Sequence, residues 1–279
     1  MRIEFTKMHG LGNDFIVFDA PARGLPGAGA LQRLADRHTG IGFDQALVLE
    51  PPRRPGSSLY YRIFNADGTE VEQCGNGARC IASLLHRRGR ARAGELLHMD
   101  SAGGPVRARV ESAGRVAVDM GVPSFIPAAL PFDAPREADP YELEVAGTRV
   151  AIGAVSIGNP HAVLTVESVA EAPVERLGPA IEAHARFPRR VNVGFMQIVD
   201  RGHIRLRVYE RGVGETQACG TGACAAVAVG RRRDRLDAEV NVRVRGGELR
   251  VNWTGAGEPI WLTGPAEVAF EGRVDAPDA

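Results

Sequence analysis

Two cysteines begin nearly identical glycine-rich strings in the two halves of the sequence. The string at Cys74 reads CGNGA, and the string at Cys219 reads CGTGA. Each cysteine directly precedes a glycine-rich turn into an alanine-rich helix, so its thiol lies at the positive end of a helix dipole. We expect this position to lower the thiol pKa and to favour the thiolate, which is the reactive form of a cysteine.

The residues that follow each cysteine predict a site for an anion. The free N–H groups of Gly75-Asn76 and Gly220-Thr221 suit a carboxylate, and glycine lets the backbone approach a ligand without a Cβ in the way. If the two halves face each other across a pseudo-two-fold axis, the cysteines lie on opposite sides of one bound molecule. A thiolate on one face can then remove a proton from a stereogenic carbon while a thiol on the other face delivers one, without any cofactor.

The other two cysteines, Cys80 and Cys224, lie inside the alanine-rich helices. A cysteine in a helix is more often a small buried apolar residue than a catalyst, and we keep that interpretation for this pair. A zinc site made of all four cysteines is the alternative. It is disfavoured because five and four residues separate the members of the two pairs, at or beyond the upper end of the about two to four that are usual between structural zinc ligands. A largely apolar helix is also expected to bury the second member of each pair.

The two cysteine strings belong to a longer internal repeat. They lie 145 residues apart (219 − 74), and the same offset relates residues 62–64 (RIF) to residues 207–209 (RVY). A Gly-Phe-x-Gln string occurs at Gly42 and again at Gly194, in the same order. Repetition of this kind indicates two structural units that share one plan.

Each half is expected to fold as strands, a helix, further strands and the helix that follows the cysteine. β-Branched and aromatic residues broken by Gly-Asn predict the opening strands, and Gly89 is expected to end the first cysteine helix as a C-cap. The expected opening strand regions span residues 3–17 and 148–166, and the expected helices span residues 30–37, 78–88, 174–185 and 223–233. The sequence therefore predicts an α/β protein of the α+β kind, built from two similar halves.

Proline and small residues over 123–140 lie near mid-chain and predict a domain boundary around residue 121. We therefore expect an N-terminal half over residues 1–121 and a C-terminal half over residues 122–265. The segment over residues 266–279 is expected to return to the first half as a strand.

The composition excludes several classes of protein. Lys plus Arg and Asp plus Glu both total 34 among 279 residues, so no net positive charge gathers nucleic acid. Lys7 is the single lysine, which leaves a Schiff-base mechanism with pyridoxal phosphate only one candidate. No apolar run is long enough for a membrane span, and Glu4 and Lys7 interrupt the start where a signal peptide needs apolar residues. We expect a cytoplasmic protein whose few cysteines are thiols.

With these motifs in place, the sequence resembles the diaminopimelate epimerases over nearly its whole length. The resemblance rests on the long strings MHGLGNDF, GIGFDQ, YRIFNADGTEVEQCGNGARC, GNPHAV, RVNVGFMQI and RVYERGVGETQACGTGACA. It implies two similar halves, each a curled, mostly antiparallel β-sheet or barrel around a central helix, with the active site in the cleft between them. It also implies a homodimer.

The resemblance implies epimerisation of LL-2,6-diaminopimelate to meso-diaminopimelate, a step in lysine and peptidoglycan-precursor biosynthesis, with no pyridoxal phosphate, other cofactor or metal. Cys219 is the implied proton acceptor in that direction and Cys74 the implied donor, while His161 and Glu210 assist near the thiols. The implied substrate-binding residues are Asn13, Gln45, Asn65, Gly75, Asn76, Asn159, Asn192, Glu210, Arg211, Gly220 and Thr221.

These residue types suit diaminopimelate, which carries a carboxylate and an ammonium at each end. Arg211 can grip a carboxylate with its planar fork, and Glu210 can receive the ammonium at the reacting carbon. Asn65, Asn159 and Asn192 supply neutral donors and acceptors for the distal end. The expected partners are therefore a small amino acid and a second copy of the chain, with no nucleic acid and no membrane.

Two other functions remain open at this point. A histidine or hydroxyproline racemase of similar fold would use the same thiols, although Arg211 and the three asparagines favour a substrate with a distal amino-acid group. A non-catalytic protein would sense an amino acid and hold a metal with the four cysteines. A substrate panel distinguishes the first alternative, and metal analysis with thiol titration distinguishes the second.

Overall fold

The same order of strands and helices occurs twice along the chain. The computed structural model describes residues 2–21, 24–72, 74–111 and 114–275. The chain divides into two compact units, with Met1–Val118 and Gly264–Ala279 in unit 1 and Asp119–Thr263 in unit 2. The sequence placed the division around residue 121 and the return to the first half at residue 266. Residues 276–279 of that predicted return lie outside the described residues.

Unit 1 contains two helices and nine strands in its described residues. The strands are β1 (Arg2–Gly10), β2 (Asn13–Asp19), β3 (Gln45–Glu50), β4 (Leu59–Asn65), β5 (Glu70–Val71), β6 (Leu96–Ser101), β7 (Gly104–Val110), β8 (Arg115–Asp119) and β18 (Glu267–Asp275). The helices are α1 (Ala28–Ala35) and α2 (Gly75–Arg87).

Unit 2 follows the same plan. Its strands are β9 (Tyr141–Val145), β10 (Thr148–Ser156), β11 (Pro160–Thr165), β12 (Asn192–Asp200), β13 (His203–Glu210), β14 (Gly214–Glu215), β15 (Glu239–Val244), β16 (Gly247–Asn252) and β17 (Trp261–Pro265). Its helices are α3 (Val174–Glu182) and α4 (Gly220–Arg232), and a single 3-10 turn covers Pro127–Ala129.

The strand pairing of the two units is the same. In unit 1 the order is β18, β1, β2, β3, β4, β6, β7 and β8, and among its described residues the parallel pairs are only β2–β3 and β4–β6. In unit 2 the order is β9 to β13, then β15 to β17, with parallel pairs only at β11–β12 and β13–β15. Strand β18, from the far end of the chain, therefore takes the place in unit 1 that β9 takes in unit 2. The predicted fold class, an α+β fold in two similar and mostly antiparallel halves, is confirmed.

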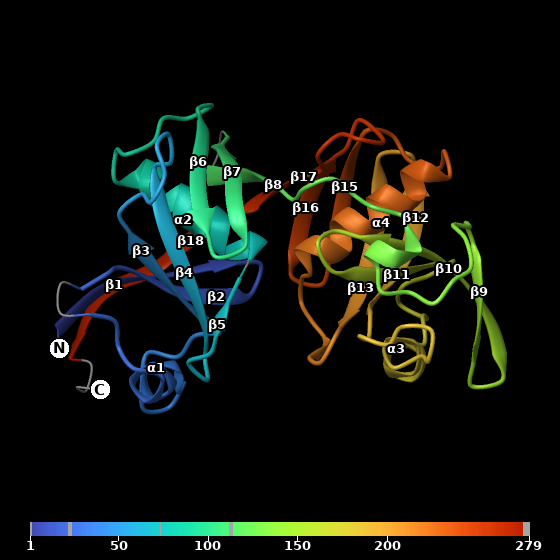
Figure 1. Cartoon of the computed structure of the whole chain (residues 1–279), viewed down its shortest axis with the longest axis horizontal. Helices are drawn as coiled ribbons and strands as arrows, with labels where there is room; N and C mark the ends of the chain where they lie inside the picture. The colour runs from blue at the N-terminus through green and yellow to red at the C-terminus, as the bar shows by residue number, and fades with distance from the viewer. Residues whose placement is uncertain (1, 22–23, 73, 112–113, 276–279) are drawn as a thin grey trace. The chain divides into compact units, whose positions relative to one another are not determined.

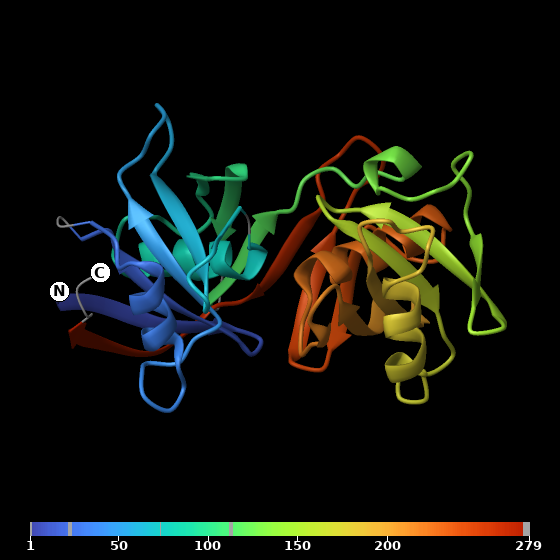
Figure 2. The same cartoon turned by 60° about the horizontal axis from the view of Figure 1, so that its bottom comes forward.

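The helix after each cysteine lies among the strands of its own unit (Figure 1). Helix α2 contacts β1, β2 and β7, and helix α4 contacts β10 to β13 and β16. Every residue from 77 to 85 and from 222 to 230 is buried, and the view in Figure 2 again shows both helices among the strands. Small residues permit this close packing, because a Cβ at Gly153 of β10 would lie 2.4 Å from Val229 of α4. These are the central helices that the resemblance implied.

Both central helices begin three residues earlier than the sequence predicted. The glycine-rich segments, expected as turns, form the first helical turn, with Gly75 and Gly220 as the first residues. At the other end, Gly89 has a φ of 69° and the N–H of Arg90 donates to Leu85, which is the Schellman arrangement. Asp234, with a φ of 53°, ends α4 in the same way. The predicted cap at Gly89 is confirmed.

The two outer helices close a second core in each unit. Leu31 and Leu34 of α1 pack in a buried cluster with Phe18 and Phe43. Helix α3 contributes to a cluster in which the rings of Phe132 and Phe187 stack with their centroids 4.4 Å apart. Burial of these apolar side chains stabilises the packing of each outer helix against its own unit. Within the described ranges, no helix has the length and apolarity that a membrane crossing needs.

Candidate active site

Cys74 is the N-cap of α2. Its backbone is extended, with φ −148° and ψ 109°, and its carbonyl oxygen accepts a bond of 2.9 Å from the N–H of Ala78. The N–H of Gly77 donates to the Cys74 sulfur at 3.4 Å. Cys74 is half-buried, and the bond from Gly77 places its sulfur over the first turn of the helix.

Cys219 is the N-cap of α4 and is more deeply buried, with an exposed fraction of 5%. Its sulfur lies 3.6 Å from the hydroxyl oxygen of Thr221. Burial raises the pKa of the Cys219 thiol, and the negative charge of Glu210 raises it further, against hydrogen bonds from Thr221 and the N–H of Gly222 that lower it. The expectation that the helix start lowers this pKa is therefore wrong for Cys219, which is a thiol in the resting protein.

The last glycine of each cysteine string is required by packing. A Cβ at Gly77 would lie 3.0 Å from a methyl carbon of Leu47. At Gly222 it would lie 2.9 Å from a methyl carbon of Val208 and 3.3 Å from the Cys219 sulfur. A side chain at either position would therefore push against the strand behind the helix, and at Gly222 also against the thiol.

Unit 1 groups four predicted site residues into two amide pairs. The side-chain nitrogen of Asn76 donates to the side-chain oxygen of Asn13 at 3.1 Å. Gln45 and Asn65 face each other across β3 and β4, and Gln45 donates to Asn65 at 2.9 Å. Among the described residues no hydrogen bond joins one pair to the other. The first pair adjoins Cys74 through the helix start, since Gly75 and Asn76 follow the cysteine directly.

Unit 2 links three predicted site residues to Cys219. His161 bonds through its Nε2 to the side-chain oxygen of Asn159 at 2.9 Å, and the side-chain nitrogen of Asn159 donates to Thr221 at 3.4 Å. Since Thr221 contacts the sulfur, a chain of neutral groups runs from the imidazole to the thiol. Gly220 and Thr221 form the start of α4, as Gly75 and Asn76 do in α2.

His161 is 1% exposed. Burial, followed by the charge of Arg211, lowers the pKa of His161 to about 3. The imidazole is therefore neutral and donates its Nε2 hydrogen to Asn159. It is linked to Cys219 through Asn159 and Thr221.

The remaining predicted residues lie at the end of β13 and beside it. Asn192 is buried; its nitrogen donates to the carbonyl of Pro160 at 3.0 Å and its oxygen accepts from the backbone N–H of Arg211 at 3.0 Å. The carboxylate of Glu210 accepts a 2.5 Å bond from the hydroxyl of Thr216. The Arg211 side chain is exposed and donates to the carbonyl of Arg189. Asn192 therefore fixes the backbone that carries Glu210 and Arg211.

The sequence reasoning missed residues that hold these side chains. Glu182 is buried and accepts a 2.7 Å bond from the N–H of Gly212, which fixes the loop after Arg211. Asp44 accepts from Asn13 at 2.9 Å, and Arg79 donates to Asn76 at 2.7 Å. Both lie inside strings that carry the resemblance, GIGFDQ and QCGNGARC, so their place in those strings was the available signal.

The single lysine is part of the framework of unit 1. Lys7 is 7% exposed, and its ammonium lies 2.6 Å from the carboxylate of Asp14 and also donates to the carbonyl of Gly42. Burial acts to raise the pKa of Asp14, but hydrogen bonds from Arg37 and Lys7 outweigh it and hold that pKa well below its usual range. The resulting ion pairs tie the start of β2 to the segment before β3.

Cys80 and Cys224 have the surroundings of packing residues. Both are fully buried, and burial raises the pKa of Cys80 to about 12. The four cysteines are all thiols. In the part of the chain that the structure describes, no three His, Cys, Asp or Glu side chains are grouped so that they could hold a metal ion.

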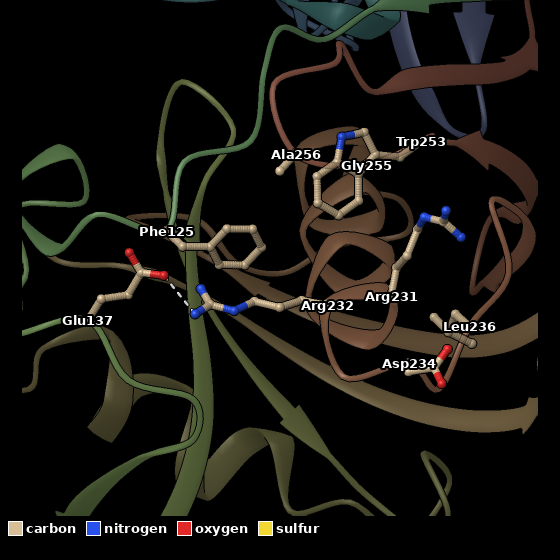
Figure 3. A pocket seen from close by; sticks show the side chains of 9 residues that line it. All are labelled: Phe125, Glu137, Arg231, Arg232, Asp234, Leu236, Trp253, Gly255 and Ala256. Carbon is tan, nitrogen blue, oxygen red and sulfur yellow. Dashed lines mark hydrogen bonds and ion pairs between the residues drawn. The ribbon is translucent and has the colours of Figure 1, made fainter.

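A pocket of about 490 Å³ lies at the other end of α4 (Figure 3). Phe125, Trp253 and the two arginines Arg231 and Arg232 line part of it, and Arg232 forms a 2.6 Å ion pair with Glu137. Since α4 has 13 residues, its ends are about 20 Å apart. This pocket is therefore separate from Cys219.

Comparison with known proteins places the chain in a family. It matches the family profile of diaminopimelate epimerase over residues 5–126 and 153–269. It is 54% identical over 276 residues to a diaminopimelate epimerase of Nitrosomonas europaea, covering 99% of this chain and 100% of that protein. It is 52% identical over 275 residues to a diaminopimelate epimerase of Stutzerimonas stutzeri, covering 98% of this chain and 99% of that protein.

Solved structures of similar fold have more distant sequences. A phenazine biosynthesis protein of the PhzF family from Bacillus anthracis matches with a TM-score of 0.70 at 17% identity, over 98% of this chain and 99% of that one. A hydroxyproline epimerase from Agrobacterium vitis, with bound trans-4-OH-L-proline, matches with a TM-score of 0.68 at 17% identity, over 98% and 92%. These likenesses establish the fold, and the close relatives establish the family: the chain belongs to the diaminopimelate epimerases.

Proposed function

We propose that this protein interconverts LL- and meso-2,6-diaminopimelate by inverting one α-carbon, with Cys74 and Cys219 as the two bases. One observation is the main support for Cys74 and Cys219 as the two bases. In a chain of this family, each of two equivalent units has a cysteine as the N-cap of its buried central helix. Two thiols at equivalent positions are what a reaction needs when its forward and reverse directions are nearly mirror images.

In the LL to meso direction, Cys219 as thiolate takes the α-proton, so the C–H bond breaks and an S–H bond forms. Cys74 as thiol gives its proton to the opposite face of the same carbon, which forms the new C–H bond and leaves a thiolate. The enzyme ends the turnover with the two protonation states exchanged, ready for the reverse reaction. The proposal requires no cofactor, because both proton transfers use the protein's own thiols.

The surroundings of Cys219 suggest how the substrate activates it. Burial and the charge of Glu210 keep the thiol protonated in the resting protein. When the substrate's α-ammonium pairs with Glu210, it neutralises the charge that opposes the thiolate. Thr221 can then stabilise the thiolate, because its oxygen accepts from Asn159 and its own hydrogen can be donated to a sulfur that only accepts.

The helix starts supply the donors for the substrate's carboxylate. The N–H groups of Gly75, Asn76, Gly220 and Thr221 belong to the first turns of α2 and α4, where no intrahelical acceptor exists. Negative charge that spreads from the α-carbon into the carboxylate is stabilised at these positions. We assign Arg211, with Asn65, Asn159 and Asn192, to the distal amino-acid group.

The proposal includes a cytoplasmic homodimer. The four thiols suit a reducing compartment. Strand β18 suits a contact between copies, since all its side chains are exposed or half-buried, whereas Tyr141, Leu143 and Val145 of the equivalent strand β9 are buried. Phe270 of β18 is 48% exposed, and a two-fold axis beside it would bring two such rings together.

A substrate panel tests the function itself. Purified protein is supplied with LL-diaminopimelate, meso-diaminopimelate, L-proline, trans-4-hydroxy-L-proline and L-histidine, and the isomers are separated after reaction. We expect turnover of the two diaminopimelates and none of the monocarboxylic amino acids. Equal or better turnover of a monocarboxylic amino acid would overturn the assignment of the distal group.

A further inference from the structure

A directional chain of hydrogen bonds runs through the predicted binding residues of unit 1. Arg79 donates to the side-chain oxygen of Asn76 at 2.7 Å, and Asn76 donates to the side-chain oxygen of Asn13 at 3.1 Å. Asn13 in turn donates to the carboxylate of Asp44 at 2.9 Å. We refer to these four side chains as the amide chain.

The charged ends determine which way both amides point. A guanidinium can only donate, and an ionised carboxylate can only accept. Arg79 therefore requires the oxygen of Asn76 on its side, and Asp44 requires the nitrogen of Asn13 on its side. The middle bond then has one possible direction, so neither amide can flip without losing a bond to a charged group.

Both ends are themselves held in place. Arg79 is completely buried, and its Nε donates to the carbonyl of Pro265. Asp44 receives a 2.8 Å bond from Arg37 on its other oxygen, and its backbone N–H donates to Asp14 at 2.9 Å. The ends of the amide chain therefore cannot rotate to follow a flipped amide.

The fixed direction decides what the two amides offer to a ligand. Asn13 and Asn76 are both half-buried. Each side-chain oxygen already accepts one bond, whereas each nitrogen has given only one of its two hydrogens among the described residues. Asn76 belongs to the first turn of α2 and is bonded to Asn13, so the second hydrogens and the N–H groups of that turn add up to a set of donors that suits an anionic group.

Unit 2 repeats the central contact without the charged ends. Asn159 and Thr221 stand where Asn13 and Asn76 stand in unit 1, and they are joined by a 3.4 Å bond. Asn159 is also hydrogen-bonded to the neutral imidazole of His161, and Thr221 also contacts the thiol of Cys219. A hydroxyl between neutral groups can turn its hydrogen, so the contact in unit 2 can respond to the charge of the thiol while the contact in unit 1 cannot.

We propose that Asp44 and Arg79 are positioning residues that lock Asn13 and Asn76 as donors to the α-carboxylate at the reacting end of the substrate. The inference rests on the proposed function, because it takes an amino acid as the substrate. Asp44 and Arg79 touch no substrate themselves and act only through the two asparagines.

Asp44→Asn tests the lock, because an amide at position 44 can present either its oxygen or its nitrogen to Asn13. We expect the KM for LL-diaminopimelate to rise by about tenfold, which corresponds to about 1.4 kcal/mol, with a smaller change in kcat. Arg37→Met is the matched control: it removes the exposed ion pairs of Arg37 to Asp44 and Asp14. It leaves the bond between Asn13 and Asp44 and the backbone bond from Asp44 to Asp14. We expect its KM to stay within about twofold of the wild type, the scatter expected where an exposed ion pair is lost.

A double-mutant cycle separates positioning from general damage. In an Asn13→Ala background, Asp44→Asn is expected to have no further effect on KM, since the residue through which it acts is gone. Two results would overturn the proposal: an equal rise in KM for Asp44→Asn and Arg37→Met, or a full additional effect of Asp44→Asn in the Asn13→Ala background.

A spectroscopic measurement tests whether Asp44 and Arg79 hold the two asparagines in place, without relying on enzyme activity. In 15N-labelled protein, the side-chain amide signals of Asn13 and Asn76 are assigned with the two alanine variants. Asp44→Asn should shift both signals, whereas Arg37→Met should leave the Asn76 signal unchanged. Arg79→Gln should shift the Asn13 signal, which is two hydrogen bonds away. If Arg79→Gln does not fold, the spectrum of Asp44→Asn is sufficient for the test. An Asn76 signal that ignores Asp44→Asn contradicts the lock. A wild-type protein that does not turn over diaminopimelate contradicts the proposed function instead, and the spectra still settle the amide chain.

Discussion

The hydroxyl oxygen of Thr221 lies 3.6 Å from the sulfur of Cys219 and accepts a hydrogen bond from Asn159 at 3.4 Å. The amide of Asn159 is fixed in turn by the neutral imidazole of His161. Either atom can be the donor between Thr221 and the Cys219 sulfur, and a thiolate can only accept, so the Thr221 hydrogen is available to the sulfur when Cys219 is ionised. Thr221 therefore connects the Cys219 thiol to Asn159 and His161.

Replacing Thr221 should make the Cys219 thiolate harder to form and so slow the removal of the α-proton. In Thr221→Val the donor to the thiolate is lost, so the pKa of Cys219 rises and kcat/KM for LL-diaminopimelate should fall by about 10- to 100-fold, the worth of one hydrogen bond to a charged group. Thr221→Ser keeps the hydroxyl and is the control. The measurement is kcat/KM against pH, in which the acid limb of the Val variant should move to higher pH. Equal profiles for the Val and Ser variants would show that the hydroxyl has no such role.

Replacing Glu210 should change the pKa of Cys219 in the opposite direction. The negative charge of Glu210 raises that pKa, so Glu210→Gln should lower it. Ultraviolet absorbance of the thiolate is followed against pH in a Cys74→Ser background, and the difference from the same protein with Cys219→Ser added reports the titration of Cys219. Glu215→Gln is the control, because Glu215 pairs with Arg207 at 2.7 Å. A pKa that does not fall in Glu210→Gln, or that falls equally in the control, would contradict the assigned cause.

His161 should make the stability of the protein depend on pH. Its pKa is lowered to about 3 from an ordinary 6.5. Between these two pH values His161 binds a proton in the unfolded chain but not in the folded one. Stability is therefore full above pH 6.5 and is lost as pH falls towards 3, by at most about 1.4 kcal/mol per pH unit for one proton. Urea unfolding of the wild type between pH 7 and 5 should show this loss. The slope should be smaller in His161→Gln, and an unchanged slope would assign the loss to other groups.

The proposed homodimer depends on β18. Phe270 is 48% exposed and packs edge-on to Phe5, with ring centroids 6.0 Å apart. Phe270→Asp should place a charge in the contact and give monomers in sedimentation velocity at micromolar concentration. Val199→Asp is the control, since Val199 is 52% exposed and belongs to unit 2. A wild-type monomer, or a dimer that survives Phe270→Asp, would refute this use of β18.

Much of the fold was predictable because the two units repeat sequence as well as structure. The paired cysteine strings and the Gly-Phe-x-Gln strings predicted the order of the strands and central helices along the chain. The start of each helix was not predictable from propensity, because the glycines that normally mark a turn form the first turn here under the cysteine N-caps. The equivalence of β18 and β9 was also hidden, since their sequences EVAFEGRVD and YELEV share no pattern.

The identity of the thiols could be predicted from sequence, but their chemical state could not. The pKa of Cys219 depends on its depth in unit 2 and on Glu210, nine positions earlier, which β13 and β14 bring to it. The role of Asp44 was equally hidden, because its bond to Asn13 crosses between separate segments. Arg79 and Asn76 are three residues apart in α2, but the direction of their bond depends on the burial of Arg79 in the folded unit. These relationships arise from tertiary packing rather than from local pattern.

The central claim is that one thiol serves each face of the α-carbon. Isotope exchange in variants that each lack one of these two thiols tests it most directly. Cys74→Ala and Cys219→Ala proteins are incubated in deuterated water with each stereoisomer, and deuterium at the α-carbon and isomer content are followed by NMR and chiral separation. Cys224→Ala, a change at a fully buried cysteine of α4, is the control and should epimerise like the wild type. The account predicts that neither variant epimerises, that Cys74→Ala exchanges only the LL isomer, and that Cys219→Ala exchanges only the meso isomer. Epimerisation at the wild-type rate by either variant would contradict it.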